Sequence, residues 1–156
     1  MTDELDPIDT KILTLLSRDA RMSNAAIAST VGIAASTAHT RIKSLFDRGL
    51  ITGFHAALNQ AKLGRGLQAI IGVSLRPGAR QESIQAFTEE IRRLPEVIQL
   101  FFVGGGDDFL VHIAVENSSK VRLFVVDHLS ARHSVASTNT SMIFEYHRNA
   151  VATDFA

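Results

Sequence analysis

Apolar residues in the first third of the chain recur at the spacing of amphipathic helices. Ile27 and Val31 fall on one helical face, and a second apolar stripe follows after a short gap. The members of this second stripe are Ala38, Ile42, Leu45 and Phe46. Gly32 stands between the stripes, where a glycine leaves a helix in the left-handed conformation at little energetic cost. Residues 24–50 therefore predict two short helices joined by a tight turn.

A third helix is expected ahead of this pair. Asp6 followed by Pro7 is typical of a helix N-cap and first helical position, and apolar residues recur from Ile8 to Leu16. Ser23 is a candidate cap for the helix that begins at Asn24. Together the three helices are enough for a small domain with its own core.

The second helix of the pair has a polar face opposite its apolar stripe. Small or polar residues lie near its start and cations further on: Ser36, Thr37, His39, Thr40, Arg41 and Lys43. Small polar side chains suit base edges and cations suit phosphates, so these residues, with Ser23, form the candidate DNA-binding surface of a helix-turn-helix. Arg41 and Lys43 are the expected phosphate contacts. A helical hairpin whose outer face is merely solvated is the alternative.

Residues 67–147 alternate between strand and helix patterns. Strands are predicted over 67–75, 97–103, 109–115 and 135–146, with amphipathic helices after the first and third strands. This βαββαβ order is that of the ferredoxin-like sandwich. Two helices cover only one face of such a sheet, and the first strand is largely apolar on both faces, so we expect a homodimer joined through the sheets.

The two patterns predict an α+β chain of two domains. A three-helix helix-turn-helix domain is expected over residues 1–53, and a hinge strand with its linker over 54–66. A ferredoxin-like effector and oligomerisation domain is expected over 67–147, followed by a tail over 148–156.

Composition and charge narrow the range of possible functions. The chain has 156 residues, no cysteine and a formal net charge of zero, so neither disulfides nor thiolate metal sites are expected. Residues 20–55 carry a modest excess of cations, which predicts weak DNA binding per copy and several copies acting together. With no signal peptide and no apolar run long enough for a bilayer, a cytoplasmic protein without membrane contact is expected.

A glycine-rich loop, Gly104 to Asp108, joins the second and third predicted strands. Its backbone N–H groups can bind a carboxylate, and its acidic side chains can accept hydrogen bonds from an ammonium group. The same residues are also ordinary hairpin-turn composition. A phosphate-binding loop is disfavoured, because the loop lacks the P-loop lysine and its two carboxylates would repel phosphate.

The motifs, in this order and spacing, resemble those of the Lrp/AsnC family of leucine- and asparagine-responsive regulators. The N-terminal motifs are Leu5-Asp6-x-x-Asp9-x-x-Ile12-Leu13-x-x-Leu16, Arg21-x-Ser23-Asn24-x-x-Ile27-Ala28, Val31-Gly32-Ile33, Arg41-Ile42-Lys43-x-Leu45 and Gly49-Leu50-Ile51. The C-terminal motifs are Val103-x-Gly105-x-x-Asp108-Phe109 and Thr138-x-Thr140-Ser141. Each motif is weak alone, but together they cover nearly the whole chain and are highly specific.

The resemblance implies a sequence-specific transcriptional regulator of double-stranded DNA that responds to an amino acid or similar small effector. It further implies association with the nucleoid, dimers that assemble into octamers, and an effector held between dimers near the glycine–aspartate loop. No cofactor is expected beyond this effector. The implied effector-binding residues are Val103, Gly104, Gly105, Gly106, Asp107, Asp108, Phe109, Thr138 and Thr140.

The sequence departs from the family pattern at three places. Ala34 stands where a serine commonly caps the recognition helix, and His39 adds a titratable group near the DNA groove. The loop has three glycines and two acids in place of a bulkier Gly-x-Tyr-Asp pattern, which leaves more room. The resemblance therefore does not identify the effector.

No arrangement of residues predicts catalysis or a metal site, so the chain is not expected to be an enzyme. The histidines of the second half are dispersed: His112, His128, His133 and His147. The sequence is also compatible with two further functions. One is an amino-acid-binding module that acts on a partner protein, and the other is a chromosome-organising DNA-binding protein without an effector.

Overall fold

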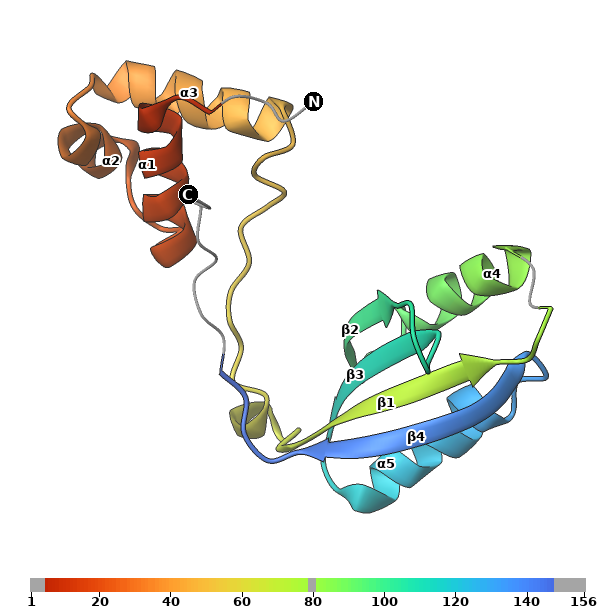
Figure 1. Ribbon diagram of the computed structural model, residues 1–156. Helices are drawn as coiled ribbons and strands as arrows, with labels where there is room; N and C mark the ends of the chain where they lie inside the picture. The colour runs from red at the N-terminus through yellow and green to blue at the C-terminus, as the bar shows by residue number, and fades with distance from the viewer. Residues whose placement is uncertain (1–4, 79–80, 148–156) are drawn as a thin grey trace. The chain divides into compact units, whose positions relative to one another are not determined.

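The computed structural model describes residues 5–78 and 81–147, and the chain divides between Ala57 and Leu58 into two compact units (Figure 1). The first unit contains three helices: α1 (Pro7–Arg18), α2 (Asn24–Val31) and α3 (Ala35–Asp47). This confirms the predicted helix-turn-helix architecture. The predicted tail over 148–156 lies outside the described residues.

Local chemistry accounts for where these helices begin and end. A carboxylate oxygen of Asp6 accepts a hydrogen bond from the Asp9 N–H at 2.8 Å, and the Ser23 hydroxyl caps α2. Gly32 ends α2 in the left-handed conformation, with φ 78°. Ala34 precedes α3 without a side-chain cap. The caps and the turn are therefore where the sequence predicts them.

The core of the first unit comes from one stripe on each helix. Its buried residues are Ile12, Leu16, Ile27, Ala28, Ala38 and Leu45. Phe46, predicted to belong to this stripe, is instead 36% exposed and packs edge-to-face against Phe54, with ring centroids 5.3 Å apart. The prediction is wrong at Phe46 because the following segment, and not a helix, covers that ring.

The predicted hinge strand does not form in this chain. Residues 51–59 have no regular secondary structure, and a 3₁₀ turn, η1 (Ala61–Leu63), follows them. A strand needs a neighbour to take up its backbone hydrogen bonds. No described strand of this chain pairs with the segment, so its β-like composition alone does not make it a strand.

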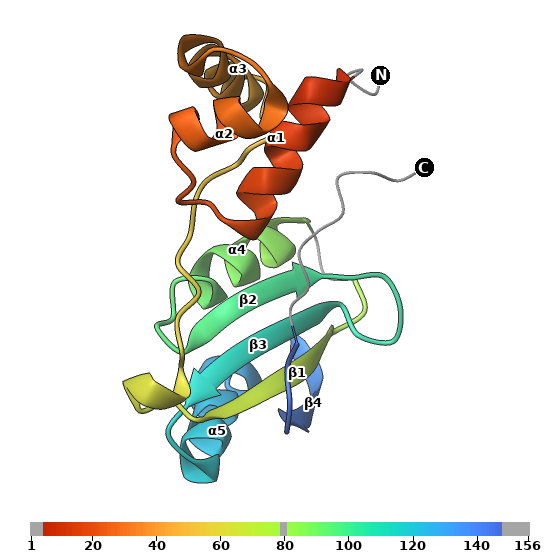
Figure 2. The same ribbon diagram turned by 90° about the vertical axis from the view of Figure 1, so that its left-hand side faces the viewer.

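The second unit has the βαββαβ order that the sequence predicts. Its elements are β1 (Leu67–Leu75), α4 (Gln81–Ile91), β2 (Val97–Phe102), β3 (Phe109–Val115), α5 (Ser118–Phe124), the π-helical segment η2 (Val125–Ser130) and β4 (Val135–Ile143). The strands form an antiparallel sheet in the order β2-β3-β1-β4. Both helices lie on the same face of this sheet (Figure 2).

Alternation along the strands separates a core face from an open face. Ala69, Ile71 and Val73 of β1 are fully buried with Phe87 of α4 and Phe124 of α5 in one hydrophobic core. The intervening β1 residues point to the face without helices: Gln68, Ile70, Gly72 and Ser74. This open face is where side chains of β1 and β3 remain available to other groups.

His112 of β3 lies on the open face, yet it is only 5% exposed. Its Nε2 atom is 2.9 Å from the side-chain oxygen of Gln68, and its Nδ1 atom is 3.4 Å from that of Gln99. Burial disfavours the charged imidazolium and so lowers the pKa of His112 below its usual value.

The lowered pKa predicts a loss of stability in mild acid. The unfolded chain protonates His112 below about pH 6.5, while the folded chain resists protonation. The free energy of unfolding is therefore unaffected by the titration of His112 above that pH, and it declines as the pH falls toward the folded-state pKa. Thermal unfolding between about pH 7.5 and 5.5 measures this decline. In His112→Gln the decline should be shallower, and equally steep profiles for the two proteins would contradict the prediction.

Candidate DNA-reading helix and effector loop

α3 presents its polar face to solvent and its apolar stripe to the core. Ala38 and Leu45 are fully buried. The exposed residues include those expected to contact DNA: Ser36, Thr37, His39, Thr40 and Lys43. Small polar residues in the first two turns of a helix suit contacts with base edges in the major groove.

Hydrogen bonds within the unit restrict several of these side chains. The Thr40 hydroxyl donates to the Ser36 carbonyl at 3.0 Å, and the Ser23 oxygen accepts from the Ala26 N–H at 3.2 Å. Asn24 contributes a residue that the sequence reasoning did not select, since its amide nitrogen lies 3.2 Å from His39 Nδ1. This contact links the start of α2 to α3 and leaves the other ring nitrogen of His39 outside the contact.

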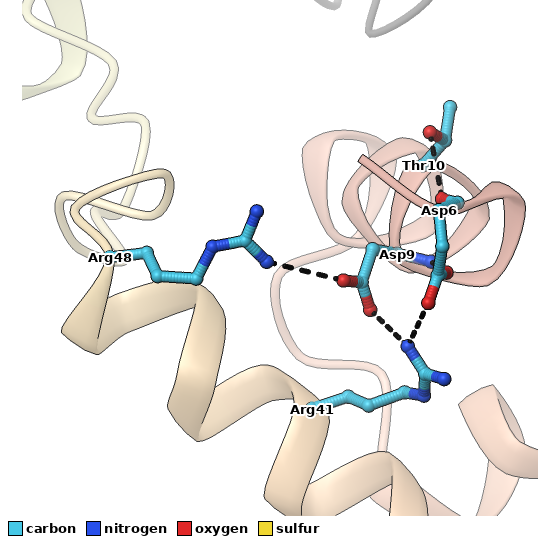
Figure 3. A network of polar contacts seen from close by, with 5 residues as sticks. All are labelled: Asp6, Asp9, Thr10, Arg41 and Arg48. Carbon is cyan, nitrogen blue, oxygen red and sulfur yellow. Dashed lines mark hydrogen bonds and ion pairs between the residues drawn. The ribbon is translucent and has the colours of Figure 1, made fainter. Parts of the chain in front are cut away.

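Arg41 differs from the other predicted DNA contacts because it is paired inside the unit (Figure 3). Its Nη1 atom lies 2.5 Å from a carboxylate oxygen of Asp6 and 2.8 Å from one of Asp9. The second Asp9 oxygen lies 3.4 Å from Nη1 of Arg48. Asp9 is 7% exposed, so this carboxylate is a nearly buried link between α1 and two arginines, Arg41 within α3 and Arg48 just after it.

The same contacts shift the titration of this cluster. The Asp9 backbone N–H and the Arg41 guanidinium hold the pKa of Asp6 below its usual value. Hydrogen bonds to Asp6 and Asp9 in turn raise the pKa of Arg41. Arg41 is therefore a charged group held against α1, and a phosphate contact would have to compete with two carboxylates for it.

The basic patch counted from the sequence is consequently smaller in three dimensions. Asp6 and Asp9 offset Arg41 and Arg48, and Lys43 pairs with Asp47 at 3.2 Å on the exposed surface. An exposed pair of this kind is weak and gives way easily to another anion. Lys43 is therefore more accessible to a phosphate than Arg41 is.

In the second unit, the glycine-rich loop is fastened to β1 by Asp108. The Asp108 N–H donates to the Val73 carbonyl at 2.9 Å, and its carboxylate accepts from the Leu75 N–H at 2.6 Å. The Val103 N–H closes the loop by donating to the Asp108 carbonyl at 2.8 Å. Asp108 is thus engaged in holding the loop. Phe109, also predicted to bind effector, is fully buried against Phe87.

Asp107 occupies a different environment from Asp108. The Ser74 hydroxyl lies 3.3 Å from both Oδ1 of Asp107 and the Gly106 carbonyl oxygen, which share its one hydrogen as acceptors. The Asp107 carboxylate lies against Gly72 on the open face of the sheet. The sequence reasoning did not select Gly72 or Ser74. Their position in the β1 alternation was the available signal, since it placed both on the open face.

Thr138 and Thr140 lie on the other side of the sheet. They pair with Val73 and Ile71, whose side chains enter the core, and directly opposed residues in an antiparallel pair share a face. Thr140 lines a groove of about 280 Å³ between β4 and α5. Within one chain, the structure therefore does not bring the two threonines together with Asp107.

Two protein-family models match the chain. The AsnC-type helix-turn-helix domain matches residues 5–45, and the Lrp/AsnC ligand binding domain matches residues 68–150. The chain belongs to the Lrp/AsnC family. It is therefore a helix-turn-helix transcriptional regulator with a ligand-binding domain, and not an enzyme, as the sequence predicts.

Known relatives of this Lrp/AsnC regulator match it over most of its length. The transcriptional regulator AldR of Mycobacterium tuberculosis is 46% identical over 94% of this chain and 82% of that protein. The crystal structure of MtbAldR superposes with a TM-score of 0.83 at 39% identity, covering 97% of this chain and 99% of that one. A Neisseria meningitidis regulator, crystallised as a complex with L-Met, gives 0.86 at 28% identity and covers 96% of both chains.

None of the helices among the described residues is both long enough and apolar enough to cross a membrane. No three potential metal ligands of the histidine or carboxylate type gather at one point in that part of the chain.

Mutation of Asp9 tests whether its contacts with Arg41 and Arg48 stabilise the helix-turn-helix unit. Asp9→Asn removes the charge that holds both arginines, so we expect a loss of about 1–3 kcal/mol in the stability of this unit. Hydrogen exchange of the core amides of α1–α3, measured in the full chain, reports that stability. Asp47→Asn is the matched control, because it removes the exposed partner of Lys43 and should cost less than about 0.5 kcal/mol. Equal protection in the two variants would exclude a structural role for the Asp9 link.

Proposed function

We propose that this Lrp/AsnC regulator binds double-stranded DNA as a homo-oligomer in the cytoplasm, and that a free amino acid or similar molecule bound at the β2–β3 loop changes that binding. The observation that carries the proposal is the exposed polar face of α3, whose opposite face is fixed in the hydrophobic core of the first unit. The L-Met complex of the Neisseria meningitidis regulator supports the amino-acid class of effector.

In the proposed DNA complex, residues near the start of α3 read base edges. Ser36, Thr37 and Thr40 are small enough for close approach to the groove floor, and His39 adds a ring nitrogen that can donate or accept. Thr40 retains acceptor capacity although its hydroxyl hydrogen is donated to Ser36. The bases would then be distinguished by the first two turns of the helix.

The phosphate contacts are proposed to come from Lys43 and Ser23. Lys43 has only an exposed partner, and the Ser23 hydroxyl can still donate its hydrogen to a phosphate oxygen while it caps α2. Arg41 is proposed to position α3 through Asp6 and Asp9. In this proposal, Arg41 orients α3 and Lys43 binds phosphate.

Self-association is proposed to use the open face of the sheet. Ile70 of β1 and Phe101 of β2 are 36% and 45% exposed, and both helices lie on the opposite face. Apolar side chains on an uncovered sheet favour burial against another surface. Such a dimer, assembled further into an octamer, would add the weak phosphate contacts of each copy.

Effector control then requires two assembly states with different affinities for the ligand. A small molecule that binds both states equally shifts nothing, whereas one that prefers a single arrangement of subunits changes the spacing of the α3 helices. The β2–β3 loop supports this role, because its glycines expose backbone N–H groups beside a carboxylate.

The reading surface is tested by removing one methyl-and-hydroxyl group at a time. Thr37→Ala and Thr40→Ala should each reduce discrimination between operator and competitor DNA, by about 1–3 kcal/mol for a direct base contact. Competition binding at fixed salt measures this difference. Thr30→Ala is the control, because Thr30 of α2 makes the same hydroxyl bond to the carbonyl four residues earlier but lies outside the proposed surface. Unchanged discrimination in both α3 variants would exclude this reading surface.

Calorimetric titration of the full chain with each of the twenty L-amino acids tests the effector. We expect at least one to bind and to change both the oligomer mass by light scattering and the affinity for DNA. Binding without any DNA affinity would favour a module that acts on a partner protein. DNA binding that is indifferent to all twenty would favour an effector-free chromosome-organising protein, and either result would overturn the proposal.

A further inference from the structure

The contact between Gly72 and Asp107 leaves no space for a side chain at position 72 of β1. A Cβ atom placed on Gly72 would lie 2.7 Å from Cγ and 2.9 Å from Oδ1 of Asp107, and it would meet Oδ2 as well. Real Cβ atoms essentially never show such separations. Gly72 lies in a strand and its φ is not positive, so the close approach of Asp107, and not backbone conformation, is what glycine permits here.

The loop cannot relieve such a clash by moving as a whole. Asp108, the next residue, is fixed to β1 by its N–H bond to Val73 and its carboxylate bond from Leu75. These two bonds define where the loop meets the strand. An added Cβ at position 72 would therefore displace the Asp107 side chain, while Asp108 stays in place.

Asp107 and the glycines beside it have hydrogen-bonding capacity that the described chain does not use. Ser74 is the donor to Oδ1 at 3.3 Å, and no described donor reaches Oδ2. The N–H groups of Gly104, Gly105 and Gly106 donate no hydrogen bond to described residues. A half-buried carboxylate beside unbonded N–H groups is complementary to a molecule that carries an ammonium and a carboxylate.

We propose that Gly72 enables recognition of the effector's ammonium group by seating the Asp107 carboxylate on β1, where Oδ2 receives that group from a zwitterionic amino acid. This inference rests on the proposed effector function and assigns different roles to the two acids of the loop. Asp107 binds the ligand and Asp108 holds the loop. Gly72 is a positioning residue that acts through Asp107.

The test uses the full chain and the L-amino acid that binds it most tightly among the standard twenty. Asp107→Asn keeps the shape and the Ser74 contact but removes the charge, and Gly72→Ala keeps the charge but displaces it. Each change should weaken binding of that amino acid about tenfold or more. The double variant should bind no more weakly than the weaker-binding single variant, because both changes remove the same contact.

Two matched controls separate this role from a general effect on the fold. Gly66→Ala is expected to bind as the wild type does, because its Cβ would meet only Ala61 at an ordinary 3.8 Å. The 2-hydroxy acid with the same side chain lacks the ammonium group and keeps only the negative charge, so Asp107→Asn should bind it at least as tightly as the wild type does. A merely structural effect of the variants would instead weaken both ligands.

The outcomes distinguish this inference from the proposed function. If no amino acid binds the wild type, the amino-acid effector and this inference both fail. If the wild type binds one and Gly72→Ala binds it equally well, or if the two changes weaken binding additively, only this inference fails. A crystal structure of Gly72→Ala with Asp107 still seated over position 72 would also overturn it.

Discussion

β1 is the strand on which the second unit depends, because it pairs with both β3 and β4 and separates the two faces of the sheet. On one face its residues enter the hydrophobic core beneath α4 and α5. On the other face Gly72 and Ser74 contact Asp107, while the backbone of Val73 and Leu75 binds Asp108. The core and the candidate effector loop therefore share one strand, so a displacement of β1 would affect both.

In the first unit, Asp9 has a comparable role, because several contacts between helices meet at this one residue. One nearly buried carboxylate connects α1 to Arg41 of α3 and to Arg48, the residue that follows α3, and Asp6 adds a second contact to Arg41 while it caps α1. Charged groups of this kind are costly to bury unless they are paired. The pairing restrains the orientation of α3, and it also lowers the positive charge that the unit offers to DNA. One copy is accordingly a weak DNA binder in the proposed function.

Much of the fold was predictable from the sequence because it depends on local chemistry. Asp6, Ser23 and Gly32 have the conformational and capping preferences that begin or end helices, and the order of apolar periods predicts βαββαβ. Where a residue's environment depends on a distant partner, the prediction was wrong or incomplete. Phe46 is covered by Phe54 and not by a helix, and the β-like segment after Leu50 pairs with none of the described strands.

The candidate sites divide in the same way. By itself the sequence determined the exposed polar face of α3 and the glycine–aspartate loop, since helical periodicity and turn composition act over a few residues. Only the tertiary structure decided that Arg41 faces Asp6 and Asp9, that Asp108 is engaged while Asp107 is open, and that Thr138 and Thr140 lie on the opposite face of the sheet. The physical reason is that Arg41 and the Asp108 carboxylate find their partners at least 32 positions away, and strand pairing sets the face of every strand residue at once.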